Sequence, residues 1–140
     1  MGIELYWDND EQTVMLCEFD KHWTWEEMFQ TLDTIKKVTD KRDYVIGAII
    51  DVSRGINIPG GSLFSAETRD KARRMLKMGE DGKGPMVIVG AGGFFKTLMS
   101  AFSMITTDKT VLTDVYFTES LEEARRIMAR RLQAGTAVPA

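Results

Sequence analysis

The chain reads Val45-Ile46-Gly47-Ala48-Ile49-Ile50-Asp51-Val52-Ser53 near its middle. This run is nearly continuous in apolar residues and rich in β-branched side chains. Such a run, without the polar alternation of a half-exposed strand, is typical of a parallel strand covered on both faces. We therefore predict a central parallel strand over residues 45–52, with Asp51 near its carboxyl end. Open α/β sheets bind ligands at that end, at a switch in strand order.

Two apolar segments precede this strand. Ile3 to Trp7 and Gln12 to Phe19 flank a polar turn over residues 8–11, which predicts a β-hairpin. The second segment is apolar at successive positions, so we expect both of its faces to be covered. The side chains expected on its two faces are Val14 and Leu16 on one, and Met15, Cys17 and Phe19 on the other.

Helices are predicted where apolar residues recur with a period near 3.6. Thr24 and Glu27 have the spacing of a capping box at the start of the first helix, and Ser120 and Glu123 have it before the last, Leu121 to about Gln133. Two further helices are expected over residues 65–78 and 94–105. The stripes expected to be buried are Trp25, Met28, Phe29, Leu32 and Ile35 in the first helix, and Leu121, Ala124, Met128 and Leu132 in the last.

Two more strands, Met86 to Gly90 and Asp114 to Phe117, complete the pattern β-β-α-β-α-β-α-β-α. A hairpin followed by strand–helix alternation predicts an α/β fold with a mixed, mostly parallel sheet. The length of 140 residues suits one domain, which we place at residues 1–134, with a flexible tail over residues 135–140.

Composition excludes several classes of protein. The formal net charge of −3 argues against nucleic-acid binding driven by bulk charge. Cys17 is the only cysteine, so no internal disulfide forms and a cysteine-based metal site is not expected. The N-terminus lacks the pattern of a signal peptide, and we expect a cytoplasmic protein without a metal or another cofactor. The apolar run over residues 86–105 is interrupted by glycines and contains Lys96, so a strand and a helix are expected there rather than a membrane span.

One segment resembles a known family. After Asp51-Val52-Ser53 the chain continues to Ile58-Pro59-Gly60-Gly61-Ser62-Leu63. This stretch and the order of elements resemble the STAS-like domains, the sporulation stage II AA-like fold of bacterial anti-sigma-factor antagonists. The resemblance implies a ligand- or partner-binding site that includes Asp51, Ser53, Gly60, Gly61 and Ser62.

The resemblance breaks down at the regulatory position. Family members that are regulated carry a serine that a partner kinase phosphorylates, and Gly61 stands at that position here. Pro59 replaces the acidic residue that precedes it. The resemblance therefore implies a divergent member without the usual phosphorylatable serine.

A glycine-rich turn is the second candidate site. Gly90-Ala91-Gly92-Gly93 follows a predicted strand and opens a helix, with Lys96 in its first turn. Gly92 and Gly93 allow close backbone approach, and a helix N-terminus favours an anion. The motif lacks the full dinucleotide or phosphate-loop pattern. It indicates either a tight strand–helix turn or an anion or nucleotide site.

The helix over residues 94–105 is apolar around much of its circumference. One stripe is sufficient to cover a sheet, so the excess predicts a further contact. We expect an interface, chiefly a homodimer, formed by Phe94, Phe95, Met99 and Phe102. A protein partner, a small apolar ligand and a membrane surface are the alternatives, the last being disfavoured.

The remaining candidates for chemistry favour structural roles. His22, the single histidine, precedes a helix cap without a recognisable nucleophile motif beside it. Cys17 lies within an apolar strand and is expected to be a buried hydrophobe. The basic rows of the last helix and the 65–78 helix are typical of solvated faces, so nucleic acid is not expected as a partner. Their members are Arg125, Arg126, Arg130 and Arg131, and Arg69, Arg73 and Lys77.

Together these features predict a non-enzymatic regulatory or ligand-binding module that acts through protein contacts. The alternative is a sensor or carrier that binds a small apolar ligand, an anion or a nucleotide between the 94–105 helix and the sheet. No catalytic constellation is recognisable in the sequence.

Overall fold

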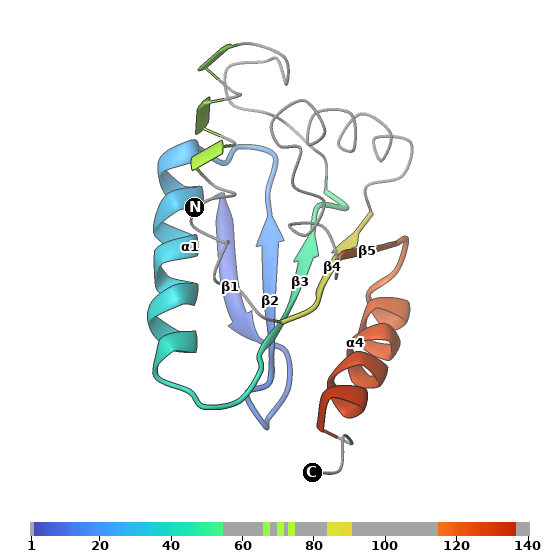
Figure 1. Cartoon of the computed structure of the whole chain (residues 1–140). Helices are drawn as coiled ribbons and strands as arrows, with labels where there is room; N and C mark the ends of the chain where they lie inside the picture. The colour runs from blue at the N-terminus through green and yellow to red at the C-terminus, as the bar shows by residue number, and fades with distance from the viewer. Residues whose placement is uncertain are drawn as a thin grey trace.

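A computed structural model of the chain describes residues 2–54, 66–67, 70–71, 73–74, 84–90 and 115–136. Its sheet contains β1 (Ile3–Trp7), β2 (Val14–Phe19), β3 (Gly47–Asp51), β4 (Met86–Val89) and β5 (Val115–Thr118), in that spatial order. Strands β1 and β2 are antiparallel, and β2 to β5 are parallel to one another. The predicted α/β class and the mixed, mostly parallel sheet are confirmed (Figure 1).

The order of the strands differs from one expectation. Strands that follow each other in the chain are neighbours in the sheet, so the described sheet has no reversal of strand order. β3 is central, between β2 and β4, as predicted. A ligand at its carboxyl end would therefore not sit in a crevice opened by a switch in strand order.

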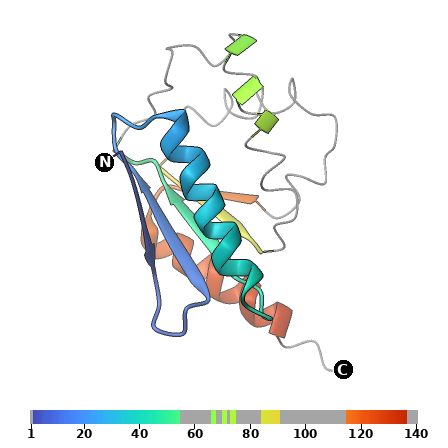
Figure 2. The same cartoon turned by 90° about the vertical axis from the view of Figure 1, so that its left-hand side faces the viewer.

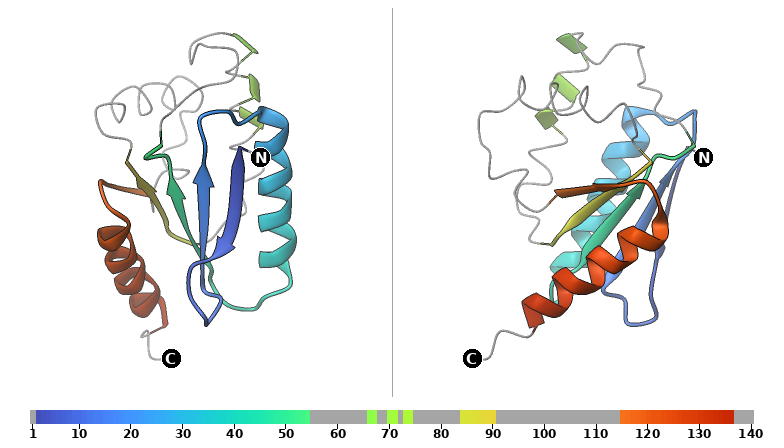
Figure 3. Two further views of the ribbon diagram at one scale, coloured as in Figure 1. Left: turned by 180° about the vertical axis from the view of Figure 1, so that it is seen from behind. Right: turned by 90° about the vertical axis from the view of Figure 1, so that its right-hand side faces the viewer.

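Two helices cover opposite faces of the sheet. α1 (Trp25–Asp40) lies on one face and α4 (Leu121–Thr136) on the other. Figure 2 shows α1 in front of the sheet, and the right-hand view in Figure 3 shows α4 in front of it. Residues 66–67, 70–71 and 73–74 are helical, within the helix expected over residues 65–78. The helix expected over residues 94–105 lies outside the described residues.

The two apolar cores follow the alternation of β2. Val14 and Leu16 pack beneath α4 with Ile49, Val87, Val89, Ala124 and Met128. Cys17 and Phe19 pack beneath α1 with Ile3, Trp23 and Trp25. Successive side chains of a strand point to opposite faces, so the predicted division of β2 into two buried faces is confirmed.

The expected start of β2 was two residues too early. Gln12 has a left-handed backbone with φ of 58°. The Asn9 side-chain oxygen accepts hydrogen bonds from the N–H groups of Thr13 and Val14, at 3.0 and 3.2 Å. An asparagine that satisfies these amides holds the chain in a turn, and the ladder begins only at Val14.

Helix capping follows the sequence in part. The N–H of Glu27 donates to the Thr24 hydroxyl oxygen at 3.1 Å, and the N–H of Glu123 donates to that of Ser120 at 3.1 Å. In a full capping box the Glu27 carboxylate would accept from the Thr24 N–H. Instead its Oε2 accepts from the Gly2 N–H at 2.8 Å, which ties the start of α1 to the start of β1.

Both helices depart in part from expectation. Of the stripe expected to be buried in α1, only Trp25 is buried, whereas Met28, Phe29, Leu32 and Ile35 are half-buried. Met28 and Phe29 still pack against the core beneath α1, and a helix about 24 Å long exceeds the roughly 17 Å span of a five-residue strand, so the sheet covers only part of it. α4 continues to Thr136, which places residues 135 and 136 in the helix rather than in the expected tail. Residues 137–140 lie outside the described part of the chain.

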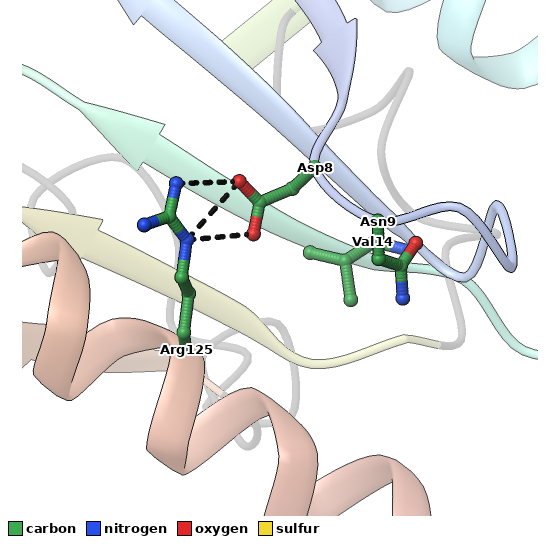
Figure 4. A network of polar contacts seen from close by, with 4 residues as sticks. All are labelled: Asp8, Asn9, Val14 and Arg125. Carbon is green, nitrogen blue, oxygen red and sulfur yellow. Dashed lines mark hydrogen bonds and ion pairs between the residues drawn. The ribbon is translucent and has the colours of Figure 1, made fainter.

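A long-range ion pair joins the hairpin to α4. The Asp8 side chain, only 8% exposed, accepts hydrogen bonds from Arg125 Nε and Nη2, the closest at 3.0 and 2.8 Å (Figure 4). These bonds raise the pKa of Arg125 above its ordinary value. Two parallel bonds between a guanidinium and a carboxylate fix orientation as well as distance, so the pair sets how α4 lies against the hairpin.

In the described part of the chain, no helix is both long enough and apolar enough to cross a lipid bilayer.

Candidate functional site

The candidate site lies where the parallel strands end. Sheet register places Glu18, Asp51, Val89 and Thr118 side by side on β2, β3, β4 and β5. These residues share the face that α4 covers, and Asp51 and Thr118 are the buried polar residues of the described chain. A row of polar side chains on otherwise apolar strands marks this edge as different from the core beneath it.

Asp51 is held in place by the residue two positions later. Its Oδ1 accepts a hydrogen bond from the Ser53 N–H at 2.9 Å, although Asp51 is only 9% exposed. Its Oδ2 accepts no hydrogen bond from any residue that the structure describes. Buried carboxylate oxygens are normally satisfied. Within the described ranges, this oxygen is therefore the polar atom at this edge to which no donor is assigned.

Ser53 and Arg54 are the exposed residues that follow Asp51. The Arg54 guanidinium lies 4.0 Å from the Glu18 carboxylate, and the Arg54 side chain is 60% exposed. The Glu18 side chain is only 23% exposed, and a pair at that distance contributes little to stability. The Arg54 side chain is thus available at the surface of the edge.

The ends of β3, β4 and β5 are tied together through Gly90. Its φ of +81° is left-handed, and a Cβ there would lie 2.6 Å from Ser53 Cα. Its N–H donates to Thr118 O at 2.9 Å, and the Val52 N–H donates to Val89 O at 3.0 Å. Only glycine tolerates both this φ and this close approach. Three strand ends are therefore held in one fixed arrangement.

Thr118, at the end of β5, forms two hydrogen bonds with Ser120. Its hydroxyl donates to Ser120 O at 2.8 Å and accepts from the Ser120 N–H at 3.2 Å. Sequence reasoning missed Thr118, because the last strand was expected to end at Phe117. Gly90 was predicted as the junction between a strand and a glycine-rich turn, but its contact with Ser53 was not predicted. The signal that identifies them is the sheet register, which a single sequence does not contain.

The predicted site residues divide into two groups. Asp51 and Ser53 lie together at the carboxyl edge of the sheet, as expected. The other predicted binding residues, Gly60, Gly61, Ser62, Gly92, Gly93 and Lys96, lie outside the described residues. The predicted interface residues Phe94, Phe95, Met99 and Phe102 also lie outside them.

Three members of the basic rows, Arg73, Arg125 and Arg126, lie beside acidic residues. Arg125 binds Asp8, and Arg126 lies 3.8 Å from Glu122. Asp70 pairs with Arg73, three residues on, at 3.3 Å. It does not pair with Arg74, although side chains four residues apart are also neighbours on a helix. Arg74 instead lies over the Phe29 ring of α1, 4.2 Å from its centroid, where a cation is attracted by the ring face.

His22 and Cys17 lie in different environments. His22 is exposed before α1, while Cys17 is 3% exposed within β2. Burial, and secondarily Glu18, raises the pKa of the Cys17 thiol to about 12. A thiol that stays protonated is a poor nucleophile and a poor metal ligand. Within the described ranges, no three His, Cys, Asp or Glu side chains gather closely enough to hold a metal ion.

The burial of Cys17 predicts its reactivity. At about pH 8 the folded chain will leave a thiol reagent unreacted, whereas the chain unfolded in urea will react completely. The folded pKa of about 12 exceeds the ordinary value of 9.0, so the unfolded chain loses its thiol proton first. The free energy of unfolding of the wild type, relative to Cys17→Ala, will therefore fall as pH rises from about 9 to about 12. Rapid labelling of the folded chain would contradict the burial of this side chain.

No family model and no curated protein sequence matches this chain.

Proposed function

We propose that this chain is a non-enzymatic regulatory module of the STAS-like kind, which binds a partner protein through the carboxyl edge of its sheet. The observation that carries the proposal is the fixed arrangement of three strand ends, with Gly90 against Ser53 and hydrogen-bonded to Thr118. A preformed surface loses less conformational entropy on binding than one that must first be ordered. The exposed Ser53 and Arg54 supply polar contacts at that surface.

The resemblance supports the same edge. Asp51-Val52-Ser53, which carries the start of the family motif, ends a central strand of the sheet. Because Gly61 replaces the phosphorylated serine, regulation by partner binding alone fits this chain better than regulation by a serine kinase. We also propose that the chain is cytoplasmic and forms a homodimer.

A non-enzymatic role is supported by the state of the described reactive groups. Catalysis requires a nucleophile, acid or base that is exposed to substrate and oriented by neighbours. The Cys17 thiol is buried and protonated, and the exposed His22 has no hydrogen-bond or ion-pair partner among the described side chains.

A small-molecule sensor is the second candidate. Gly90 starts the Gly90-Ala91-Gly92-Gly93 turn with a backbone that leaves no room for a Cβ. Ser53 occupies that space, so the support for a ligand is the glycine-rich sequence that follows Gly90, because glycines let main-chain N–H groups approach a small ligand closely. In this candidate function, an anion or nucleotide would bind at Gly92, Gly93 and Lys96, and an apolar ligand between the 94–105 helix and the sheet.

A matched pair of variants tests the proposed surface. Ser53→Arg adds bulk and one positive charge at the edge, while Thr34→Arg makes a similar change on the exposed surface of α1. Both positions are exposed, so each change should alter the free energy of unfolding by less than about 0.5 kcal/mol. With tagged chains as baits in a lysate of the source cells, wild type and Thr34→Arg will recover a common partner that Ser53→Arg loses.

Two other outcomes have defined meanings. If Ser53→Arg recovers the same partner in the same amount, the carboxyl edge is not the binding surface. If native mass spectrometry instead detects a small molecule on the wild type that Ser53→Arg loses, the sensor is the correct function.

A further inference from the structure

The outer edge of β1 presents backbone groups that β2 does not use. The Asp20 N–H donates to Gly2 O at 2.7 Å, and the Asp8 N–H donates to Val14 O at 2.8 Å. In an antiparallel pair, hydrogen-bonded and non-hydrogen-bonded residues alternate, so the even-numbered residues of β1 face β2. The N–H and C=O groups of Ile3, Leu5 and Trp7 therefore point away from the sheet.

The same alternation is seen on the other side of β2. The Gly47 N–H donates to Thr13 O at 2.8 Å, so the odd-numbered residues at the start of β2 face β3 while its even-numbered residues face β1. β1 is the first strand in the spatial order, and no described strand pairs with its outer side.

Among the described residues, β1 lacks most of the features that protect an exposed edge. Natural edge strands are blocked by proline, by charged side chains such as lysine, by a bulge, by very short length or by a covering segment. β1 pairs over five residues without a bulge, and it contains neither proline nor lysine. Glu4 is its only charged side chain, so any strand that joins this edge has to accommodate one carboxylate.

A second copy of β1 can pair with this edge, and in one of the three registers compared below the Glu4 carboxylate does not face another carboxylate. If two copies pair antiparallel about Leu5, then Leu5 faces Leu5, Ile3 faces Trp7, and Glu4 faces Tyr6. All three outward-pointing residues of each copy are then hydrogen-bonded. A register centred on Glu4 would place two carboxylates opposite each other, and one centred on Tyr6 would place Glu4 opposite Asp8. Like charges in directly opposed positions are destabilising.

Tyr6 is suited to face a carboxylate. Its side chain is exposed, and its hydroxyl already donates to the Glu4 carboxylate of its own chain. That hydrogen bond, with smaller contributions from desolvation and Glu18, raises the pKa of Tyr6 to about 12. A phenol has one proton to donate, so in a dimer the Tyr6 hydroxyl would exchange the Glu4 carboxylate of its own chain for that of the second copy.

We propose that β1 pairs with β1 of a second copy of this chain, antiparallel and centred on Leu5, so that two five-stranded sheets become one continuous sheet. On the α4 face, each Tyr6 hydroxyl then lies opposite the partner's carboxylate. On the α1 face, apolar Ile3 and Trp7 lie opposite each other. The occupant is a second copy because the side chains of β1 complement themselves about Leu5.

The dimer will be weak. A pairing of two five-residue strands covers less than the roughly 800 Å² per partner of a standard stable interface. Sedimentation velocity over about 1 μM to 1 mM spans the range in which such association is measured. The wild type will shift from monomer to dimer within it, and the amides of Ile3, Leu5 and Trp7 will exchange more slowly as concentration rises.

Side-chain variants test the register. Tyr6→Glu places a carboxylate opposite Glu4 at two symmetry-related positions, and the dissociation constant will rise about tenfold or more. Combining it with Glu4→Lys makes both pairs attractive and will restore dimerisation.

A backbone variant tests the pairing itself. Leu5→Pro removes an N–H that points away from β2, so it spares the internal ladder and abolishes the dimer. Leu5→Val keeps that N–H and serves as its control. If Leu5→Pro does not fold, the Tyr6→Glu variant and its rescue decide the question. A wild type that stays monomeric at the highest concentration, or a dimer that Tyr6→Glu does not weaken, overturns the proposal.

Discussion

Replacing Ile49 with alanine is expected to lower the free energy of unfolding by about 3–4 kcal/mol. Ile49 is completely buried at the middle of the central strand β3. Sheet register places it between Leu16 of β2 and Val87 of β4, and Met128 of α4 belongs to the same core. Because several elements pack against Ile49, the surrounding side chains cannot collapse into the space left by the deleted carbons. The loss of stability will therefore include both the transfer free energy of those carbons and the cost of a cavity.

Urea denaturation with a constant m-value measures this change. Ile49→Val, which deletes one methylene, will lose about 1 kcal/mol. Val45→Ala, at an exposed position before the same strand, will lose less than about 0.5 kcal/mol. A loss below about 1 kcal/mol for Ile49→Ala would mean that the face of β3 beneath α4 is not packed as described.

Gly90→Ala is expected to lower the free energy of unfolding by about 2–4 kcal/mol. An alanine at φ of +81° costs about 1–2 kcal/mol in backbone strain. Its Cβ would also lie 2.6 Å from both Ser53 Cα and Ser53 Cβ, so the ends of β3 and β4 would have to separate. The proposed binding of a partner at the carboxyl edge is expected to weaken together with stability.

Ser53→Gly provides the matched test of that contact. In the Gly90→Ala background, Ser53→Gly removes Ser53 Cβ, one of the two atoms closest to the new alanine Cβ. It will therefore restore part of the lost stability. The strain of the positive φ and the approach to Ser53 Cα will remain. A double-mutant cycle measured by urea denaturation gives the coupling between the two positions. If Gly90→Ala is as stable as the wild type, the left-handed conformation at this turn is wrong.

The sequence determined the local elements of this fold well. The bounds of β1, the division of β2 between two cores and the inward stripe of α4 all follow from side-chain periodicity. Thr24 and Ser120 cap the helices that follow them, because a cap depends on residues only three positions apart. Asp51 at the carboxyl end of a central strand follows in the same way from a continuous apolar run.

Only the tertiary structure decided which distant residues meet. Asp8 binds Arg125 across 117 positions, Glu27 reaches Gly2 instead of completing its box, and Gly90 closes on Ser53. Local periodicity fixes the face to which a side chain points, but not the strand or helix end beside it. That pairing is set by strand order and register, which the free energy of packing the whole sheet determines.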